Sequence, residues 1–373
     1  MSTLEQFRAT FGEESGYLDW GRVGPLSRTV VAEAQGMTDL LAKGRFGSLA
    51  VFDEQEPRMH DAVSALIGMP ADQVVTQPNT SMGLMHAMFG LTGDVLLSAG
   101  EFPSLPIAAV RASEALQVVR PVWLNTDHGR VTAGAVREQL TDSIVAVAVT
   151  LVDSRTGYVT DLDGIRQVIG DRLLIVDAIQ GFGVVDAPYT AADVVVSGGQ
   201  KWCRAGWGTG FMAMSERAID RLTPVVSGYT GTADPNVWDD VEPPVAGAAA
   251  YRVTNPDRIA QTRFAAALEE IHAVGVDVIQ AAVAENVERV IDLADEFAIP
   301  VVSSRDERER SGLVVLEPPA EQLTLLTASL FNHGVTATNR LGTVRLSVHA
   351  ELSDDTLGML QGAFTSYGTA AIY

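Results

Sequence analysis

The stretch 173–201 reads LLIVDAIQGFGVVDAPYTAADVVVSGGQK. It holds two short apolar runs, Leu173–Asp177 and Asp193–Ser197, and polar residues follow the end of each run. Consecutive apolar residues are typical of strands that are covered on both faces, as in parallel sheets. Ligands of open parallel sheets bind at the carboxyl ends of the strands. We therefore expect Asp177, Gln180 and Lys201 to lie at one ligand-binding edge of such a sheet.

The same pattern continues on both sides of this stretch. Further strands are predicted at Val74–Thr76, Val95–Ser98, Val118–Val122, Ile144–Val149 and Gly210–Met214. Helices are predicted between them at Thr80–Phe89, Leu105–Ala115, Ala133–Leu140 and Leu162–Ile169. Strands that alternate with helices predict an α/β fold, here a mostly parallel seven-stranded sheet with helices on both faces.

The pattern changes in the last third of the chain. Residues 229–256 are rich in Gly, Pro, Thr and Asp, which indicates a long irregular connection. Beyond it we expect helices and short strands, listed in chain order as Arg258–Val274, Val276–Phe297, Val301–Val302, Gly312–Leu316, Ala320–Asn332, Val335–Thr338, Thr343–Ser347 and Asp354–Tyr367. We predict a large domain over residues 1–256 and a smaller α+β domain over 257–373, with residues 1–20 packing near the smaller one.

Composition narrows the classes of function. The 373 residues carry 26 Lys and Arg against 47 Asp and Glu, a formal charge of −21. This charge argues against binding nucleic acid or an anionic membrane through a basic surface. The single cysteine, Cys203, excludes an intramolecular disulfide, and the six histidines show no metal-ligand spacing, so we expect no metal site. Without a signal pattern or a spanning apolar segment, we expect a soluble cytoplasmic protein.

Lys201 stands just after a buried strand and before a glycine-rich turn. Burial there would lower the pKa of its amine and make it a nucleophile toward an aldehyde. Asp177 ends the neighbouring strand, and a buried carboxylate needs a cationic partner. The pyridinium nitrogen of pyridoxal phosphate is such a partner.

Two further segments follow strand ends. Asn79, Thr80 and Ser81 begin a helix, whose free N–H groups and hydroxyls could hold a phosphate. Phe102 follows the next strand and could stack on a flat cofactor ring.

Together these residues resemble the class V aminotransferase family, the fold-type-I pyridoxal-phosphate enzymes that include cysteine desulfurases and kynureninases. The likeness runs from Tyr17-Leu18-Asp19 to Val344-Arg345-Leu346-Ser347. Its most specific part is Asp177-x-x-Gln180 followed by Gly199-Gln200-Lys201.

The resemblance implies a role for each matching position. Lys201 would form the Schiff base with pyridoxal 5′-phosphate and shuttle a proton, and Asp177 would hold the pyridine nitrogen. Arg345 would bind the α-carboxylate of an amino acid substrate. Gln180 would contact the phenolic oxygen, Asn79 and Thr80 the phosphate, and Phe102 would stack on the ring. Asp153 occupies a position where relatives usually carry Asn beside the cofactor. The implied cofactor-binding set is Asn79, Thr80, Phe102, Asp153, Asp177, Gln180, Gln200 and Lys201.

Each of these residues also has a simpler interpretation. A lysine can be on the surface, an aspartate or an Asn-Thr-Ser trio can cap a helix, a phenylalanine can be core, and an arginine can pair with a surface acid.

The resemblance also bears on the reaction. The family is dimeric with shared active sites, so we expect a homodimer. Cys203 lies two residues past Lys201 and not in the small domain, which argues against the persulfide chemistry of cysteine desulfurases. We predict an aminotransferase, with a C–S or β-lyase or an epimerase as the alternative and a non-catalytic binding protein as a remote one. Residues that could line the substrate pocket are Trp20, Arg22, Arg155, Trp207, Tyr229 and Arg340.

Overall fold

A computed structural model describes residues 3–127, 129–234, 236 and 238–371. Within them, one mixed sheet has the seven predicted strands in the order β1-β7-β6-β5-β4-β2-β3. Strand β7 runs antiparallel to both of its neighbours, and the other pairs are parallel. This confirms the predicted mostly parallel α/β fold. The strands are β1 (Val74–Thr76), β2 (Gly93–Leu97), β3 (Val119–Trp123), β4 (Ile144–Thr150), β5 (Leu173–Asp177), β6 (Val194–Gly198) and β7 (Gly210–Met214).

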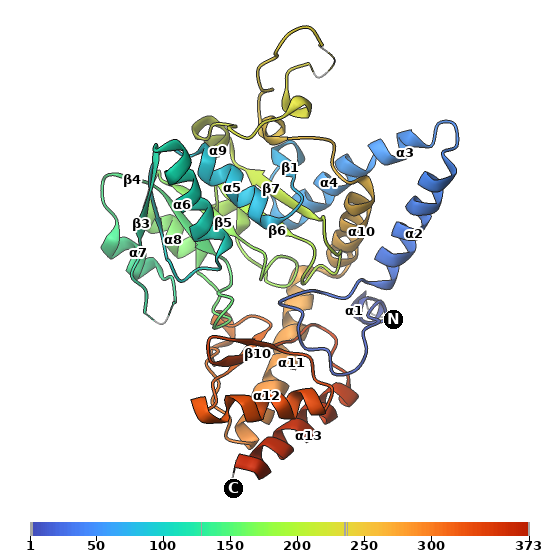
Figure 1. Ribbon diagram of the computed structural model, residues 1–373, viewed down its shortest axis with the longest axis vertical. Helices are drawn as coiled ribbons and strands as arrows, with labels where there is room; N and C mark the ends of the chain where they lie inside the picture. Colours follow the sequence, from blue (N-terminus) through green and yellow to red (C-terminus); the bar gives the residue numbers. More distant parts are fainter. Residues whose placement is uncertain (1–2, 128, 235, 237, 372–373) are drawn as a thin grey trace.

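Helices cover both faces of this sheet because its strands are apolar on both sides. In β5, Ile175 packs into the core on one face, whereas Leu174 and Val176 pack into the core on the other. The first face is covered by α5 (Thr80–Gly90), α6 (Ser104–Leu116) and α9 (Glu216–Arg221). The second is covered by α4 (Gln55–Ile67), α7 (Ala133–Gln139), α8 (Leu162–Ile169) and α10 (Arg258–Val274) (Figure 1).

Within the described residues, five α-helices lie where the sequence predicted no element: α1 (Thr3–Arg8), α2 (Arg28–Lys43), α3 (Leu49–Asp53), α4 and α9. Arg58 of α4 joins two other helices, since its guanidinium lies 2.8 Å from Glu33 of α2 and 2.6 Å from Glu269 of α10. Helix α10 packs against both α2 and α4. The first helix after residue 257 therefore lies on the body that holds the large sheet.

A second, three-stranded sheet has the order β8-β10-β9 and lies below the first in Figure 1. Its strands are β8 (Leu313–Leu316), β9 (Thr338–Arg340) and β10 (Thr343–Ser347), and its helices are α11 (Val276–Glu296), α12 (Leu323–Asn332) and α13 (Asp354–Ala371). The strand predicted at Val335–Thr338 is displaced, since β9 begins three residues later and ends two residues later. Thr336 instead pairs its backbone with Gly16 and Leu18 of the N-terminal segment.

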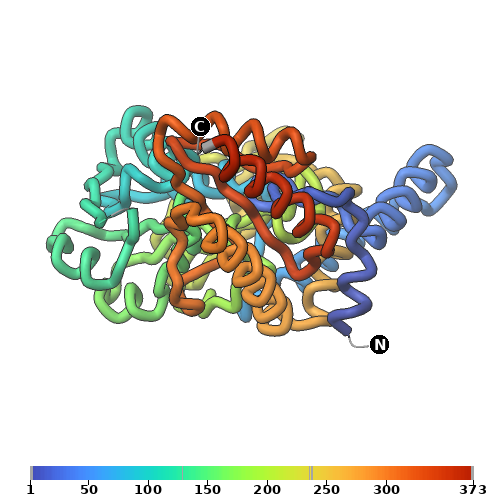
Figure 2. Tube along the Cα trace, turned by 90° about the horizontal axis from the view of Figure 1, so that it is seen from below, coloured from blue at the N-terminus to red at the C-terminus, as the bar shows by residue number. Residues whose placement is uncertain are grey.

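The N-terminal segment therefore lies against the second sheet. After α1 (Thr3–Arg8), bridges join Tyr17 to Thr336 and Asp19 to Ser347. Figure 2 shows this segment running beside the C-terminal elements. It brings the carboxylate of Asp19 to 3.9 Å from Arg345 of β10.

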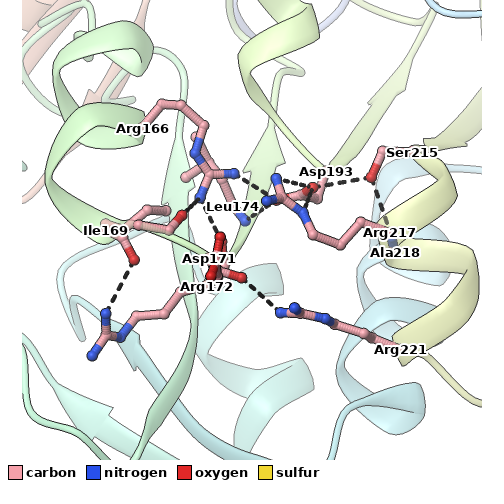
Figure 3. A network of polar contacts seen from close by, with 11 residues as sticks. Arg166, Ile169, Asp171, Arg172, Leu174, Asp193, Ser215, Arg217, Ala218 and Arg221 are labelled. Atoms are coloured by element: carbon pink, nitrogen blue, oxygen red, sulfur yellow. Dashed lines mark hydrogen bonds and ion pairs between the residues drawn. The ribbon is translucent and has the colours of Figure 1, made fainter.

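The opposite end of the large sheet is held by a charged network (Figure 3). Asp193, almost fully buried, lies 2.8 Å from Arg166 and 2.6 Å from Arg217, and it accepts the N–H of Leu174. This carboxylate precedes β6, so it fixes the start of the strand that ends near Lys201.

Residues 229–256 hold two 3₁₀ turns, Tyr229–Gly231 and Ala248–Tyr251, and the described part between these turns contains no helix or strand. This agrees with the irregular connection that the composition predicts, and it protrudes at the top of Figure 1. Within the described residues, no helix combines the length and the apolar character needed to cross a membrane.

Candidate active site

Lys201 lies in the turn that follows β6 and is only 8% exposed. Burial lowers the pKa of its amine to about 8, against the opposing pull of the Asp177 carboxylate. The N-terminal segment closes over this turn, because the N–H of Gly24 donates to the carbonyl of Gln200 over 2.8 Å. A Cβ at Gly24 would overlap the carbonyl oxygen of Lys201, so the close approach requires glycine.

Asp177 ends β5 and is fully buried. Its Oδ1 accepts the N–H of Ile179 over 3.1 Å, whereas its buried Oδ2 has no hydrogen-bond partner among the described residues. Burial raises the pKa of the carboxyl to about 6, although the Ile179 N–H and the Lys201 amine act in the opposite direction. The site thus holds a carboxylate oxygen that is ready to accept a buried N–H.

Gln180 is held on both sides of its amide. Its Oε1 accepts a hydrogen bond from Trp202 Nε1 over 3.0 Å, and its Nε2 donates to the carbonyl of Gly21 over 2.8 Å. These bonds fix the orientation of the amide and leave one N–H of Nε2 as its remaining donor.

The first turn of α5 forms another part of the site. Asn79 caps the helix by accepting the N–H of Met82 over 3.0 Å. Thr80 Oγ1 is buried without a hydrogen bond to any described residue, and a Cβ at Gly198 would lie 3.2 Å from it and would overlap Gln200 Oε1. Thr80, Gln200 and the end of β6 therefore meet at the amino end of a helix, where N–H groups without intrahelical partners favour anions.

Phe102 and Arg345 lie near Lys201. The Lys201 Nζ lies 5.4 Å from the centre of the Phe102 ring. Arg345 is buried, its Nη1 donates to the carbonyl of Ser154 over 3.1 Å, and its Nη2 lies 3.9 Å from Asp19 Oδ1. Burial lowers the pKa of this guanidinium, and Asp19 counteracts the shift.

Asp153 is used in a local turn. Its Oδ1 accepts the N–H groups of Arg155 and Thr156 over 2.7 and 2.8 Å. Asp153 therefore shapes the loop that carries the Ser154 carbonyl, and that carbonyl in turn holds Arg345.

Three residues without a predicted role also belong to this region: Asp19, Glu101 and Trp202. Glu101 accepts the hydroxyl of Thr150, and burial raises its pKa to about 7. Glu101 follows β2, so the rule that ligands bind at the carboxyl ends of parallel strands identifies it. That rule does not identify Asp19 or Trp202. Asp19 reaches the site because the N-terminal segment pairs with the second sheet, and Trp202 belongs to it through its hydrogen bond to Gln180.

Other candidates lie elsewhere. The ring of Trp20 is buried against Phe11, Tyr17 and His349. Trp207 and Tyr229 are exposed on the surface.

The chemistry of this set fits pyridoxal 5′-phosphate. The group has an aldehyde, a protonatable ring nitrogen and a phosphate. They match in turn the amine of Lys201, the unpartnered Oδ2 of Asp177, and the unpartnered hydroxyl of Thr80 at the start of α5.

Residues 52–316 match the family model described as aminotransferase class-V. The chain is 26% identical over 293 residues to a kynureninase from Deinococcus radiodurans, a match that covers 74% of this chain and 69% of that protein. It is 29% identical over 270 residues to a probable hercynylcysteine sulfoxide lyase from Mycobacterium tuberculosis, covering 69% of this chain and 62% of the lyase, less than two thirds of its length.

Solved structures share the fold at lower identity. A cysteine desulfurase from Thermococcus onnurineus superposes with a TM-score of 0.83 at 19% identity, covering 93% of each chain. The cystine C–S lyase C-DES, in complex with its product cysteine persulfide, superposes with a TM-score of 0.84 at 14% identity, covering 94% of this chain and 97% of that one.

Proposed function

Because this chain belongs to the class-V aminotransferase family, whose cofactor is pyridoxal 5′-phosphate, we propose that it is a lyase that cleaves the Cβ–S bond of an S-substituted cysteine. With one water, the substrate gives a thiol, pyruvate and ammonium. The relatives named above are a kynureninase and a sulfoxide lyase, and the structural neighbours include a C–S lyase. These names favour the lyase alternative of the sequence analysis over its main prediction, an aminotransferase.

The observation that carries the proposal is that one site holds a buried amine, Lys201, and a buried carboxylate, Asp177, whose charges act on each other. When bound, pyridoxal 5′-phosphate withdraws electrons from the α-carbon of an amino acid. Lys201 Nζ would hold the cofactor by its aldehyde carbon. Once the amino group of the substrate replaced it there, the freed amine would take the proton from the substrate Cα. Its lowered pKa supports this role, because a neutral amine is the form that binds an aldehyde or accepts a proton. Asp177 Oδ2 would accept the ring N–H and keep that nitrogen positively charged.

The remaining residues would bind and orient. Arg345 would grip the α-carboxylate in two parallel hydrogen bonds, as a guanidinium does, and so fix the Cα proton relative to Lys201. Phe102 would stack on the ring, and Gln180 would donate its free N–H to the phenolic oxygen. Asn79, Thr80 and Gln200 would surround the phosphate. Asp153 would act through the loop that supports Arg345.

The buried state of Cys203 supports a lyase over a desulfurase. Its thiol donates to the carbonyl of Phe182, and burial raises its pKa to about 12. Such a thiol is not a nucleophile at neutral pH, and the chain has no other cysteine that could accept sulfur.

The test is to incubate the cofactor-loaded protein with S-methyl- and S-ethyl-L-cysteine and to measure thiol and pyruvate. The proposal expects both products in equal amounts from the wild type and neither from Lys201→Ala. Racemised substrate without thiol would instead support the epimerase alternative. Absence of any conversion across a broad panel of S-substituted cysteines, by protein that carries the cofactor, would overturn the proposal.

A further inference from the structure

A pocket of about 190 Å³ beside Arg345 is lined by three arginines, Arg155, Arg340 and Arg345, and among its described lining residues Glu317 is the acid. Three guanidinium groups around a small space create a strong positive potential. A chain with a formal charge of −21 has placed them together in one pocket.

Two of the three lie near a carboxylate, Arg345 near Asp19 and Arg155 near Asp153. Arg345 faces the buried Asp19 at 3.9 Å, and the hydroxyl of Thr338 donates to that carboxylate over 2.6 Å. Arg345 has an assigned ligand, the α-carboxylate of the substrate. Arg155 and Arg340 have no assigned ligand.

Arg155 is built into the wall of the pocket. Its Nε and Nη2 are buried and make no hydrogen bond to any described residue, although Nη2 lies 3.5 Å from Asp153 Oδ2. Gly100 and Gly129 allow it this position, because a Cβ at either one would overlap its guanidinium. Buried N–H groups without acceptors are costly, so the site favours a ligand that supplies an acceptor.

Arg340 extends from β9 over the same space. Its Cζ lies 5.4 Å from the centre of the Phe102 ring, the same ring whose centre is 5.4 Å from Lys201 Nζ. Its guanidinium forms no ion pair or hydrogen bond with another residue in the described part of the chain, so its charge is free to meet a ligand. Arg340 lines the pocket and lies near the ring that also lies near the Lys201 amine, so the pocket is close to that amine.

We propose that the substrate carries a second anionic group, a carboxylate at the far end of its sulfur substituent, which Arg155 and Arg340 bind while Arg345 holds the α-carboxylate. This inference rests on the proposed Cβ–S cleavage for the identity of the substituent. It adds a substrate class, the acidic S-conjugates of cysteine. Each arginine would donate to a carboxylate oxygen, the geometry for which the guanidinium is suited.

Two matched substrates test the charge requirement: S-(2-carboxyethyl)-L-cysteine and its neutral amide, S-(2-carbamoylethyl)-L-cysteine. They differ in charge but hardly in size. We expect kcat/KM for the acid to exceed that for the amide by about 10- to 100-fold, the effect of losing a charged hydrogen-bonded partner. Equal values for the two substrates would overturn the inference and leave the lyase proposal intact.

Variants of the pocket arginines test whether these residues cause the preference for the acid. In Arg340→Gln and Arg155→Gln, the ratio of kcat/KM for the acid to kcat/KM for the amide should fall toward unity, because the charged partner of the second carboxylate is lost. Arg111→Gln is the matched control, because Arg111 lies exposed on α6 and pairs with Glu114. A preference retained in both pocket variants would contradict the assignment.

A binding measurement separates the two proposals. 3,3′-Thiodipropionate is the acid substrate without its amino group and cannot react, and its monoamide, which keeps one carboxylate and lacks the second, is the control. Calorimetry on the cofactor-loaded protein should show about 10-fold tighter binding of the diacid, lost in Arg340→Gln. This result without any C–S cleavage would support the anion pocket and reject the lyase, whereas equal binding of diacid and monoamide would reject the pocket.

Discussion

Trp202 donates a hydrogen bond from its indole N–H to Oε1 of Gln180 over 3.0 Å, and both side chains are buried. Trp202 is the residue next to Lys201, so the lysine turn and the Gln180 amide are fixed to each other. The bond also sets which end of the amide donates, which matters because a cofactor oxygen needs a donor.

Trp202→Phe removes this hydrogen bond and leaves Gln180 Oε1 buried without its donor. We expect cofactor affinity to fall about 10-fold, since an unsatisfied buried acceptor costs about 1–3 kcal/mol. Equilibrium titration with pyridoxal 5′-phosphate, followed by absorbance, measures the change. An unchanged affinity in a folded variant would show that the amide needs no such support.

Asp177→Asn keeps the size of the side chain and removes its charge. We expect kcat to fall at least about 100-fold, because the ring nitrogen loses its anionic partner. Without cofactor, the same variant should be more stable by about 1–3 kcal/mol, because a buried carboxylate that lacks a full set of partners is costly. Steady-state kinetics measures the loss of kcat, and thermal unfolding of the cofactor-free protein measures the gain in stability. Lower stability together with a normal kcat would contradict the role assigned to Asp177.

The lowered pKa of Lys201 predicts a pH dependence. A protonated amine cannot attack an aldehyde, so the rate at which the cofactor-free protein takes up the cofactor should rise with pH and level off above about 8. Stopped-flow absorbance at pH 6 to 10 measures this midpoint. Arg345→Gln should move it upward, because a positive neighbour that favours the neutral amine is lost. A rate that still climbs toward the ordinary lysine pKa of 10.5 would contradict the buried site.

The sequence predicts the large sheet well because its signal is local. The predicted and observed bounds of β5 coincide, and both give a strand that ends in Asp177. The helix α4 gives no comparable signal, because it buries Glu56 and His60 among its apolar residues. Glu56 pairs with Arg258, 202 residues later, over 2.9 Å, and with Arg252 over 3.3 Å. In the sequence, a buried charged residue whose partner lies far along the chain cannot be distinguished from an exposed one.

The same distinction applies within the site. Residues that follow strands, such as Asp177 and Lys201, can be found by the rule that ligands lie at strand ends. The pairing of Asp19 with Arg345 cannot, because it depends on how the N-terminal segment adds to the second sheet. The turn around Asp153 depends on which N–H groups its carboxylate reaches, so the residue type alone does not show whether it binds a cofactor or shapes the loop.

The network in Figure 3 predicts a purely structural variant. Asp193→Ala leaves Arg166 and Arg217 without their shared carboxylate at the start of β6. We expect a loss of about 3 kcal/mol in the free energy of unfolding, typical of removing one partner of a buried ion pair. Activity per folded molecule should stay unchanged, because this end of the sheet is opposite Lys201. Chemical unfolding combined with active-site titration separates the two effects, and a kcat that falls with retained folding would contradict this division.

The most direct test of a Lys201-dependent lyase is the number of turnovers in the absence of any 2-oxo acid. The cofactor-loaded protein is mixed with a large excess of an S-substituted cysteine, and pyruvate is counted per site. A lyase regenerates its site after each cleavage, so the account predicts many equivalents of pyruvate, and none from Lys201→Ala. An aminotransferase keeps the amino group on its cofactor, so conversion of about one equivalent of substrate per site to its 2-oxo acid, with further turnover only after an added 2-oxo acid, would contradict it.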